Sequence, residues 1–265
     1  MEIKSNFSLK PYNTFALESF AKEFVEVKTL AQLRSLFSSR KEIDKLLILG
    51  GGSNILLGKY FDGLVIQNSI KGIEVIKDTD EEIWVEVGAG ENWHDWVMFC
   101  VQKNWPGFEN LSLIPGTVGA APMQNIGAYG VEVKEFIERV KFIYLPDLSK
   151  KELNNEQCNF GYRESVFKHD LKDKVFIYSV VFKINKNRNL NLSYGDINKV
   201  LSENGVEDPS IKDVSDAVIS IRKSKLPDPK ELGNSGSFFK NPEISKSQFD
   251  QLKAEFSEMP GYELG

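Results

Sequence analysis

Histidine and cysteine are scarce in this chain of 265 residues, which contains two of each. Cys100 and Cys158 lie far apart and form no Cys-x-x-Cys pair, so we expect two reduced thiols rather than a disulfide framework. His94 and His169 are too few for a multi-histidine metal site, and two lone cysteines do not complete one, so we predict no metal. His94 lies beside Trp93 on an expected amphipathic helix, which favours a structural role for its imidazole.

The sequence also lacks long hydrophobic runs and any concentration of positive charge. No run reaches the roughly 18 apolar residues of a membrane span. Residues 1–20, MEIKSNFSLKPYNTFALESF, contain no continuous apolar stretch of the kind found in signal peptides. The formal net charge is −5 and the lysines are scattered, which argues against a nucleic-acid or anionic-membrane partner. We therefore expect a soluble, cytoplasmic and monomeric protein.

What is present is the ordinary composition of a globular protein, with 41% hydrophobic residues and an alternation of strand and helix signals. AKEFVEVKT at 21–29 alternates like a strand and leads into a helix that opens at Thr29. LLILGGGSNILL at 46–57 predicts a buried strand followed by a glycine turn. Two alternating runs over 72–90 predict a hairpin, and apolar spacing over 92–104 predicts an amphipathic helix.

The end of the chain has little material for a core. A polar stretch over 185–201 interrupts the strand signals, and residues after Pro227 supply one glycine turn, one short apolar run and one expected helix at 246–259. That is too little for an independent domain core. This segment either packs on the other domains or begins a domain that continues beyond this sequence.

GGGSN at 50–54 follows a predicted strand, where glycines can adopt positive φ and present N–H groups to an anion such as a phosphate. The dinucleotide fingerprint GxGxxG fails here, because Ile55 stands where its third glycine belongs. The P-loop pattern fails too, since Tyr60 follows Gly58-Lys59 in place of Ser or Thr. A plain turn between strands stays open as the alternative.

PGTVGAAPMQNIGAYG at 115–130 has almost no charge and few bulky side chains. Pro115 and Pro122 stiffen this backbone while its glycines leave it open to close approach, and Gln124 and Asn125 offer amide groups. The combination suits a large planar ligand with a polar edge and a pyrophosphate tail. A tightly packed structural loop is the alternative.

Two further stretches contain candidate catalytic residues. GYRES at 161–165 places Arg163 between an aromatic residue and an acid, where a guanidinium can clamp a carboxylate or an enolate. GNSGSFFKNP at 233–242 surrounds Ser237 with glycines and phenylalanines, and a serine in a water-poor pocket can transfer a proton. No nucleophile-elbow motif is present there. A surface arginine and a turn serine are the simpler interpretations.

Eight motifs follow one another in the order found in one known family: NTFAL, LGGGSN, GAGENWHDWV, IPGTVGAAPMQNIGAYGVE, GYRESVFK, LSYGDI, KLPDP and GNSGSFFKNP. They closely resemble those of the UDP-N-acetylenolpyruvoylglucosamine reductases, the flavoproteins that complete UDP-N-acetylmuramic acid for peptidoglycan. The resemblance covers nearly the whole chain, and LSYGDI resembles the form of the family with an extra tyrosine loop.

The resemblance implies an α/β (α+β) fold of the vanillyl-alcohol oxidase or PCMH type, with two FAD-binding subdomains followed by a substrate-binding domain. On this chain the parts are expected at 1–70, at 71–225 with the tyrosine-loop insertion at about 186–205, and at 226–265. Family members use a further glutamate in a C-terminal segment. This chain ends at Gly265 without a matching motif, so we expect the C-terminal part to be missing, with turnover less well supported than cofactor binding.

The resemblance also implies non-covalent FAD, NADPH as co-substrate and the roles of particular residues. Small side chains are expected along the flavin because backbone amides must reach it. The expected FAD-binding residues are Gly50, Gly51, Gly52, Ser53, Asn54, Pro115, Gly116, Thr117, Gly119, Ala120, Gln124, Asn125, Gly127, Ala128 and Tyr129. Arg163 is expected to stabilise the enolate-like charge and Ser237 to donate the proton. Tyr194 and Lys225 match positions that contact the diphosphates of substrate or NADPH, and Asn241 is expected close to the same site.

Two other functions stay open from the sequence. One is a different FAD oxidoreductase of the same fold class, although GYRES and GNSGSFFKNP are not expected in that broader class. The other is a truncated, non-catalytic nucleotide-binding remnant.

Overall fold

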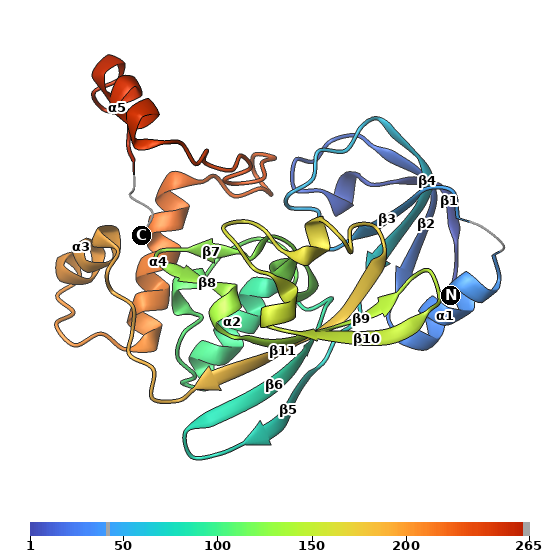
Figure 1. Ribbon diagram of the computed structural model, residues 1–265, viewed down its shortest axis with the longest axis horizontal. Helices are drawn as coiled ribbons and strands as arrows, with labels where there is room; N and C mark the ends of the chain where they lie inside the picture. The colour runs from blue at the N-terminus through green and yellow to red at the C-terminus, as the bar shows by residue number, and fades with distance from the viewer. Residues whose placement is uncertain (41–42, 262–265) are drawn as a thin grey trace.

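The computed structural model describes residues 1–40 and 43–261, which form two large β-sheets, a small two-stranded sheet and several helices (Figure 1). The first sheet has the order β1-β2-β4-β3. Its strands are β1 (Lys4–Ser8), β2 (Phe20–Val27), β3 (Leu46–Leu49) and β4 (Tyr60–Asn68). β1 is antiparallel to β2, while β2 and β3 are both parallel to β4.

Helix α1 (Leu30–Ser38) connects the two parallel strands β2 and β3. Thr29 caps it as predicted, because its side chain accepts a hydrogen bond from the Gln32 amide at 3.2 Å. The buried face of α1 packs Leu33 and Leu36 on the first sheet, and the same cluster includes Phe176 of the second sheet. This shared core joins the two sheets.

The second sheet is antiparallel throughout and has the order β10-β9-β11-β6-β5. Its strands are β5 (Ile73–Asp78), β6 (Glu82–Gly88), β9 (Ile137–Tyr144), β10 (Ser149–Asn154) and β11 (Val175–Asn185). The predicted hairpin over 72–90 is confirmed as β5 and β6. The predicted helix over 92–104 is confirmed as α2 (Trp93–Gln102), which buries Trp93 and Trp96 in the largest core cluster.

Short elements lie between the main strands and helices along the chain. They are the two-stranded β7 (Gly127–Ala128) and β8 (Val131–Glu132), together with short 3-10 helices. The 3-10 helices are η1 (Lys10–Tyr12), η2 (Glu109–Leu111), η3 (Val118–Gln124), η4 (Val133–Glu135), η5 (Glu156–Cys158) and η6 (Val166–Lys168). Cys100 and Cys158 are buried and free, and burial raises the pKa of the Cys158 thiol to about 12.

Three helices follow the last strand: α3 (Gly195–Glu203), α4 (Ile211–Lys225) and α5 (Lys246–Glu255). α3 and α4 share a small core that includes Ile197, Leu201 and Val218, and the Tyr129 and Tyr194 rings pack against it. α5 has no buried residue and stands away from the body in Figure 1. Within the described part of the chain, no helix is long and apolar enough to cross a membrane.

Candidate active site

The first glycine turn, Gly50–Asn54, follows the end of β3. Gly52 has φ +60°, and a Cβ at this position would overlap the Tyr12 carbonyl oxygen, so only glycine fits. Within residues 1–40 and 43–261, the amides from Gly51 to Asn54 donate no hydrogen bond. A run of free N–H groups at a strand end is an anion-binding concavity.

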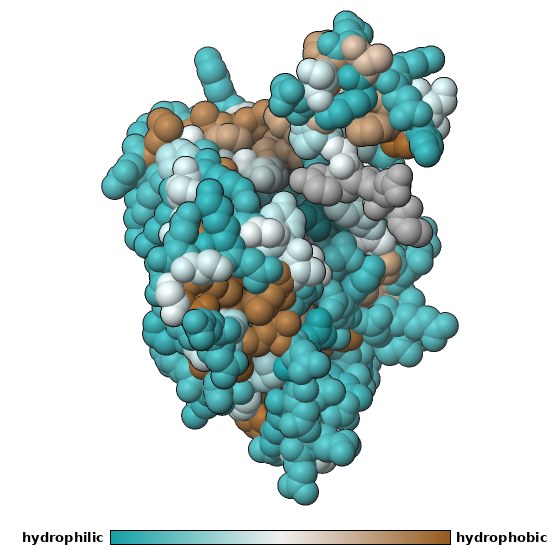
Figure 2. Space-filling model, turned by 90° about the vertical axis from the view of Figure 1, so that its left-hand side faces the viewer, coloured by the Kyte–Doolittle hydropathy of each residue, from teal (hydrophilic) through white to brown (hydrophobic). Residues whose placement is uncertain are grey.

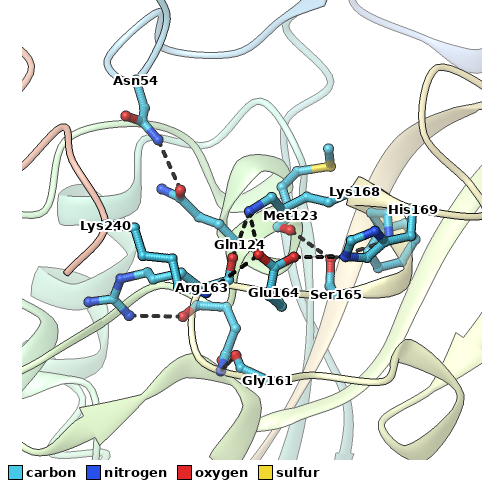
Figure 3. Close-up of polar contacts among 12 residues, drawn as sticks. Asn54, Met123, Gln124, Gly161, Arg163, Glu164, Ser165, Lys168, His169 and Lys240 are labelled. Carbon is cyan, nitrogen blue, oxygen red and sulfur yellow. Dashed lines mark hydrogen bonds and ion pairs between the residues drawn. The ribbon is translucent and has the colours of Figure 1, made fainter. Parts of the chain in front are cut away.

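The second glycine stretch lies directly against the first. An ideal Cβ on Gly51 would be 2.9 Å from Gly116 Cα, and Asn54 Nδ2 donates to Gln124 Oε1 at 2.9 Å (Figure 3). The amides of Gly116 and Thr117 also donate no hydrogen bond within the described residues. Segments more than sixty residues apart thus line one site with unpaired backbone donors.

Two glycines in these stretches are required by the packing of the protein itself. A Cβ on Gly119 would be 2.5 Å from Ala89 Cβ, and a Cβ on Gly51 would meet the Gly116 backbone. Both glycines therefore allow two protein segments to touch. Contact of these two glycines with FAD stays a prediction.

Asn125 connects the second stretch to its neighbours. It is fully buried with φ 42°, its Nδ2 donates to Gly161 O at 2.9 Å, and its Oδ1 accepts from the Lys134 amide at 3.0 Å. Both ends of this side chain are used by the protein. The Asn125 amide also donates to Ala121 O, and its carbonyl accepts from Arg163, so the backbone of this residue is used by the protein as well.

Arg163 is held by the glycine stretch itself. Its Nη2 donates to Gly127 O at 2.6 Å and its Nη1 donates to Asn125 O at 3.3 Å, while the guanidinium lies 5.2 Å from the Tyr162 ring centroid. Its backbone is in the left-handed region with φ 57°. These bonds fix the guanidinium beside β7, with further N–H groups available to an anion.

The segment that contains Ser237 reaches the same place from the other side. The Asn234 amide donates to Thr14 O at 2.9 Å, the Phe15 and Phe238 rings meet at 5.6 Å, and Lys240 Nζ lies 3.6 Å from Glu164 Oε1. Ser237 is exposed. The structure therefore brings the loops of Ser237 and Arg163 together.

Glu164 forms ion pairs with several side chains at this contact (Figure 3). Its carboxylate lies 3.1 Å from Lys168 Nζ and 2.8 Å from His169 Nε2, in addition to Lys240. Hydrogen bonds from Lys168 and then from His169 lower the pKa of Glu164, so the carboxylate is charged at neutral pH.

Tyr194 and Lys225 lie together at a second position along the site. Tyr194 precedes α3, and its ring centroid is 5.2 Å from that of Tyr129 in an edge-on arrangement. Lys225 Nζ contacts Asp196 Oδ2 at 2.5 Å, and this hydrogen bond is the main cause of the raised pKa of Lys225. Asn241 is exposed and belongs to the same segment as Ser237.

Three polar side chains near the first turn were not singled out from the sequence. Thr14 Oγ1, Gln67 Oε1 and Ser235 Oγ are buried and lack a hydrogen-bond partner among the described residues. The Thr14 amide donates to Gly52 O, and Gln67 Nε2 donates to Gly50 O. An unpaired buried polar atom costs roughly 1–3 kcal/mol. From the sequence, Thr14 and Ser235 could have been noticed only because they lie in the motifs NTFAL and GNSGS. Gln67 lies in no motif.

The described residues hold no group of three or more His, Cys, Asp or Glu side chains that could hold a metal ion. A metal-free arrangement of amides and one guanidinium is suited to a large anionic ligand.

Comparisons with known proteins agree with this geometry. The family model described as FAD binding domain matches residues 21–147. The UDP-N-acetylenolpyruvoylglucosamine reductase of Flavobacterium johnsoniae is 52% identical over 265 residues, which cover 100% of this chain and 78% of that protein. The protein of the same name from Amoebophilus asiaticus is 46% identical over 262 residues, covering 98% of this chain and 77% of that protein.

A solved structure supports the fold. The crystal structure of the UDP-N-acetylenolpyruvylglucosamine reductase of Thermus caldophilus matches with a TM-score of 0.66 at 23% identity, over 95% of this chain and 79% of that one. The predicted α/β FAD-binding fold is confirmed. Over its whole length, this chain shares about half of its residues with one of these relatives. The chain therefore belongs to the UDP-N-acetylenolpyruvoylglucosamine reductase family.

Proposed function

We propose that this chain is an FAD-dependent reductase that converts UDP-N-acetylenolpyruvoylglucosamine to UDP-N-acetylmuramate with NADPH, in peptidoglycan-precursor synthesis. The observation that carries the proposal is the meeting of two glycine stretches with free amides from Gly51 to Asn54 and at Gly116 and Thr117. Arg163 is anchored on the second of these stretches.

The residues present fit non-covalent FAD. The pyrophosphate of this cofactor needs hydrogen-bond donors, and the free amides of the first turn supply them without a basic side chain. Thr14 Oγ1 and Ser235 Oγ are buried and unpaired beside that turn, so a bound cofactor would satisfy groups that the protein leaves open. Both cysteine thiols are buried in the core, where they cannot form a covalent link to the flavin.

The chemistry that bound FAD supplies is hydride transfer from NADPH to the enolpyruvyl group. Reduction of an alkene conjugated to a carboxylate places negative charge on that carboxylate. Arg163 stabilises this charge with a guanidinium that is already oriented by the carbonyls of Asn125 and Gly127, so little reorganisation is needed during the reaction.

Ser237 supplies the proton to the carbon beside the carboxylate. Its loop is docked on the Arg163 loop through Lys240 and Glu164, and its hydroxyl is not used by another group in the described structure. Tyr194 and Lys225 bind the diphosphate of the sugar nucleotide, since Lys225 is a firmly protonated cation, and Asn241 assists from the same segment as Ser237.

The proposal predicts a yellow protein. Denaturation should release FAD into the supernatant, because no covalent link holds it. In anaerobic stopped-flow experiments, NADPH should bleach the flavin absorbance and the enolpyruvyl sugar nucleotide should restore it. A colourless protein that takes up no added FAD would overturn the proposal. Bleaching by NADPH without reoxidation would show that the enolpyruvyl sugar nucleotide is not the substrate of this chain.

A further inference from the structure

The start of α2 runs alongside the segment that leads into the second glycine stretch. Trp93 Nε1 donates to Leu111 O at 2.9 Å, and the Trp93 amide donates to Gly116 O at 3.1 Å. The Val118 amide donates to Glu91 O at 2.9 Å. The motif GENWH at 90–94, which has no role in the proposed chemistry, is thus hydrogen-bonded along residues 111–118.

Between these contacts lies Leu113, whose backbone has φ 57°. The left-handed conformation is unfavourable for a leucine, so other groups must hold it there. The Leu113 amide donates to His94 Nδ1 at 3.0 Å, and Arg222 Nε donates to the Leu113 carbonyl at 3.3 Å. A side chain from α2 and one from α4 therefore hydrogen-bond to the amide and the carbonyl of Leu113.

The first of these bonds defines the state of the imidazole. Because the partner is a backbone N–H, His94 Nδ1 must be the acceptor, which makes the ring neutral with its proton on Nε2. Partial burial is the main cause that lowers the pKa of His94 below its usual 6.5. Arg222 and Lys223 on α4 act in the same direction, and Asp95 on α2 opposes them.

We propose that His94 is a positioning residue for the flavin site: its neutral imidazole holds Leu113 in the turn that aims the Gly116 and Thr117 amides, and so sets the affinity for FAD. The inference rests on the proposed function. Protonation would put a donor where the Leu113 amide needs an acceptor, and the turn would lose this support. FAD affinity should therefore be complete above pH about 6.5 and fall as the pH drops through the lower pKa of folded His94.

Two substitutions separate hydrogen bonding from protonation. In H94N, Oδ1 takes the place of Nδ1 as an acceptor that does not titrate, whereas H94L has no acceptor. FAD is titrated into flavin-depleted protein at pH 5.5 to 8, and the dissociation constant is read from flavin fluorescence. We expect H94L to bind FAD about tenfold more weakly at pH 8, the usual effect of leaving a partly buried amide unpaired. H94N should bind close to wild type at pH 8 and should not weaken in acid.

Gln102→Leu, at an exposed position near the other end of α2, is the matched control and should leave FAD affinity unchanged. The ¹⁵N chemical shifts of the histidines report the tautomer without any ligand. A proton on Nδ1 at pH 8, wild-type affinity in H94L, or the same acid loss in H94N would each overturn the inference. A wild-type protein that binds no FAD would instead contradict the proposed function, while the tautomer would still decide the contact between His94 and Leu113. If H94L does not fold, H94N and the tautomer give the answer.

Discussion

Four residues around the candidate site have left-handed backbone although none of them is glycine: Leu113, Asn125, Tyr129 and Arg163, with φ from 42° to 57°. Each costs roughly 1–2 kcal/mol relative to a right-handed conformation. The surroundings hold them in place, since Asn110 Nδ2 donates to Tyr129 O and the other three are fixed by the contacts described above. Such strain gathers where backbone direction has to be precise.

At the same scale, Ser237→Ala should separate the two half-reactions. Reduction of the flavin by NADPH does not need the serine proton and should be nearly unchanged. Reoxidation by the sugar nucleotide should slow by about 10²–10⁴-fold, the usual worth of a positioned proton donor. Stopped-flow absorbance of the flavin measures both steps.

Arg163→Lys is the companion variant and should also slow reoxidation more than reduction. Lysine keeps the charge, but it cannot bond both Asn125 O and Gly127 O and still face a substrate with a planar fork. Equal slowing of both half-reactions by Ser237→Ala would remove the serine from its proposed role.

Among the elements, the contact between the loops at 161–165 and 233–242 depends on few groups. The Tyr162 ring lies beside two cations, with the Arg163 guanidinium at 5.2 Å and Lys240 Nζ at 5.3 Å from its centroid. The Lys240–Glu164 pair spans the two loops at 3.6 Å, and both side chains are more than a third exposed. An exposed pair of this kind is worth about 0–1 kcal/mol.

Reversing this pair tests whether it docks the Ser237 loop. Lys240→Glu should slow flavin reoxidation by up to about fivefold at low salt, since it sets two carboxylates against each other. The double variant K240E/E164K should recover part of the rate. Asp216→Asn, which removes the exposed Lys212–Asp216 pair on α4, is the control and should change nothing. Equal rates for K240E and wild type at low salt would show that the loop docks without this ion pair.

Local pattern was enough to predict the elements with strong periodicity. The hairpin over 72–90 and α2 follow directly from alternating and helical spacing of apolar residues. β10 and α3 were not predicted. β10 is a largely exposed edge strand of sequence SKKELN, and α3 lies within a polar stretch that was read as an interruption. α3 does present Ile197, Val200 and Leu201 at helical spacing, a signal that was overlooked among the polar residues around it.

The site could be predicted from sequence only as a set of separate stretches. The glycine turn, the second glycine stretch, and the loops of Arg163 and Ser237 were each visible as motifs. Their pairwise contacts, such as Asn54 with Gln124 or Asn234 with Thr14, join residues so far apart that no local rule connects them. The left-handed turn at Leu113 was also hidden, because leucine gives no signal for positive φ.

Across the whole molecule, the described segment after Leu232 is the part least covered by the rest. The Phe239 side chain is 88% exposed and that of Phe256 is 54% exposed. In Figure 2, α5 projects from the top of the molecule as a separate group of mixed hydrophilic and hydrophobic residues. Stability of the two sheets therefore owes little to this helix.

Limited trypsin digestion should show this difference. Lys246 and Lys253 in α5 should be cut first, and the thermal midpoint of the remaining protein should change by less than about 1 °C, because no buried contact is lost. Mass spectrometry of timed samples and a melting curve measure both. First cuts within β9, β10 or α4 would contradict the expectation.

The hydrogen bond from the Asn234 amide to Thr14 O, with Phe238 against Phe15, ties a late part of the chain to an early one. On the ribosome, Thr14 and the Gly50–Asn54 turn emerge long before this partner, and domains fold from the N-terminus as synthesis proceeds. The proposed FAD site thus lacks its contact with residues 233–238 until they leave the exit tunnel. We therefore expect stable loading of the flavin to be a late event in the life of the nascent protein, set by the order in which the chain is made.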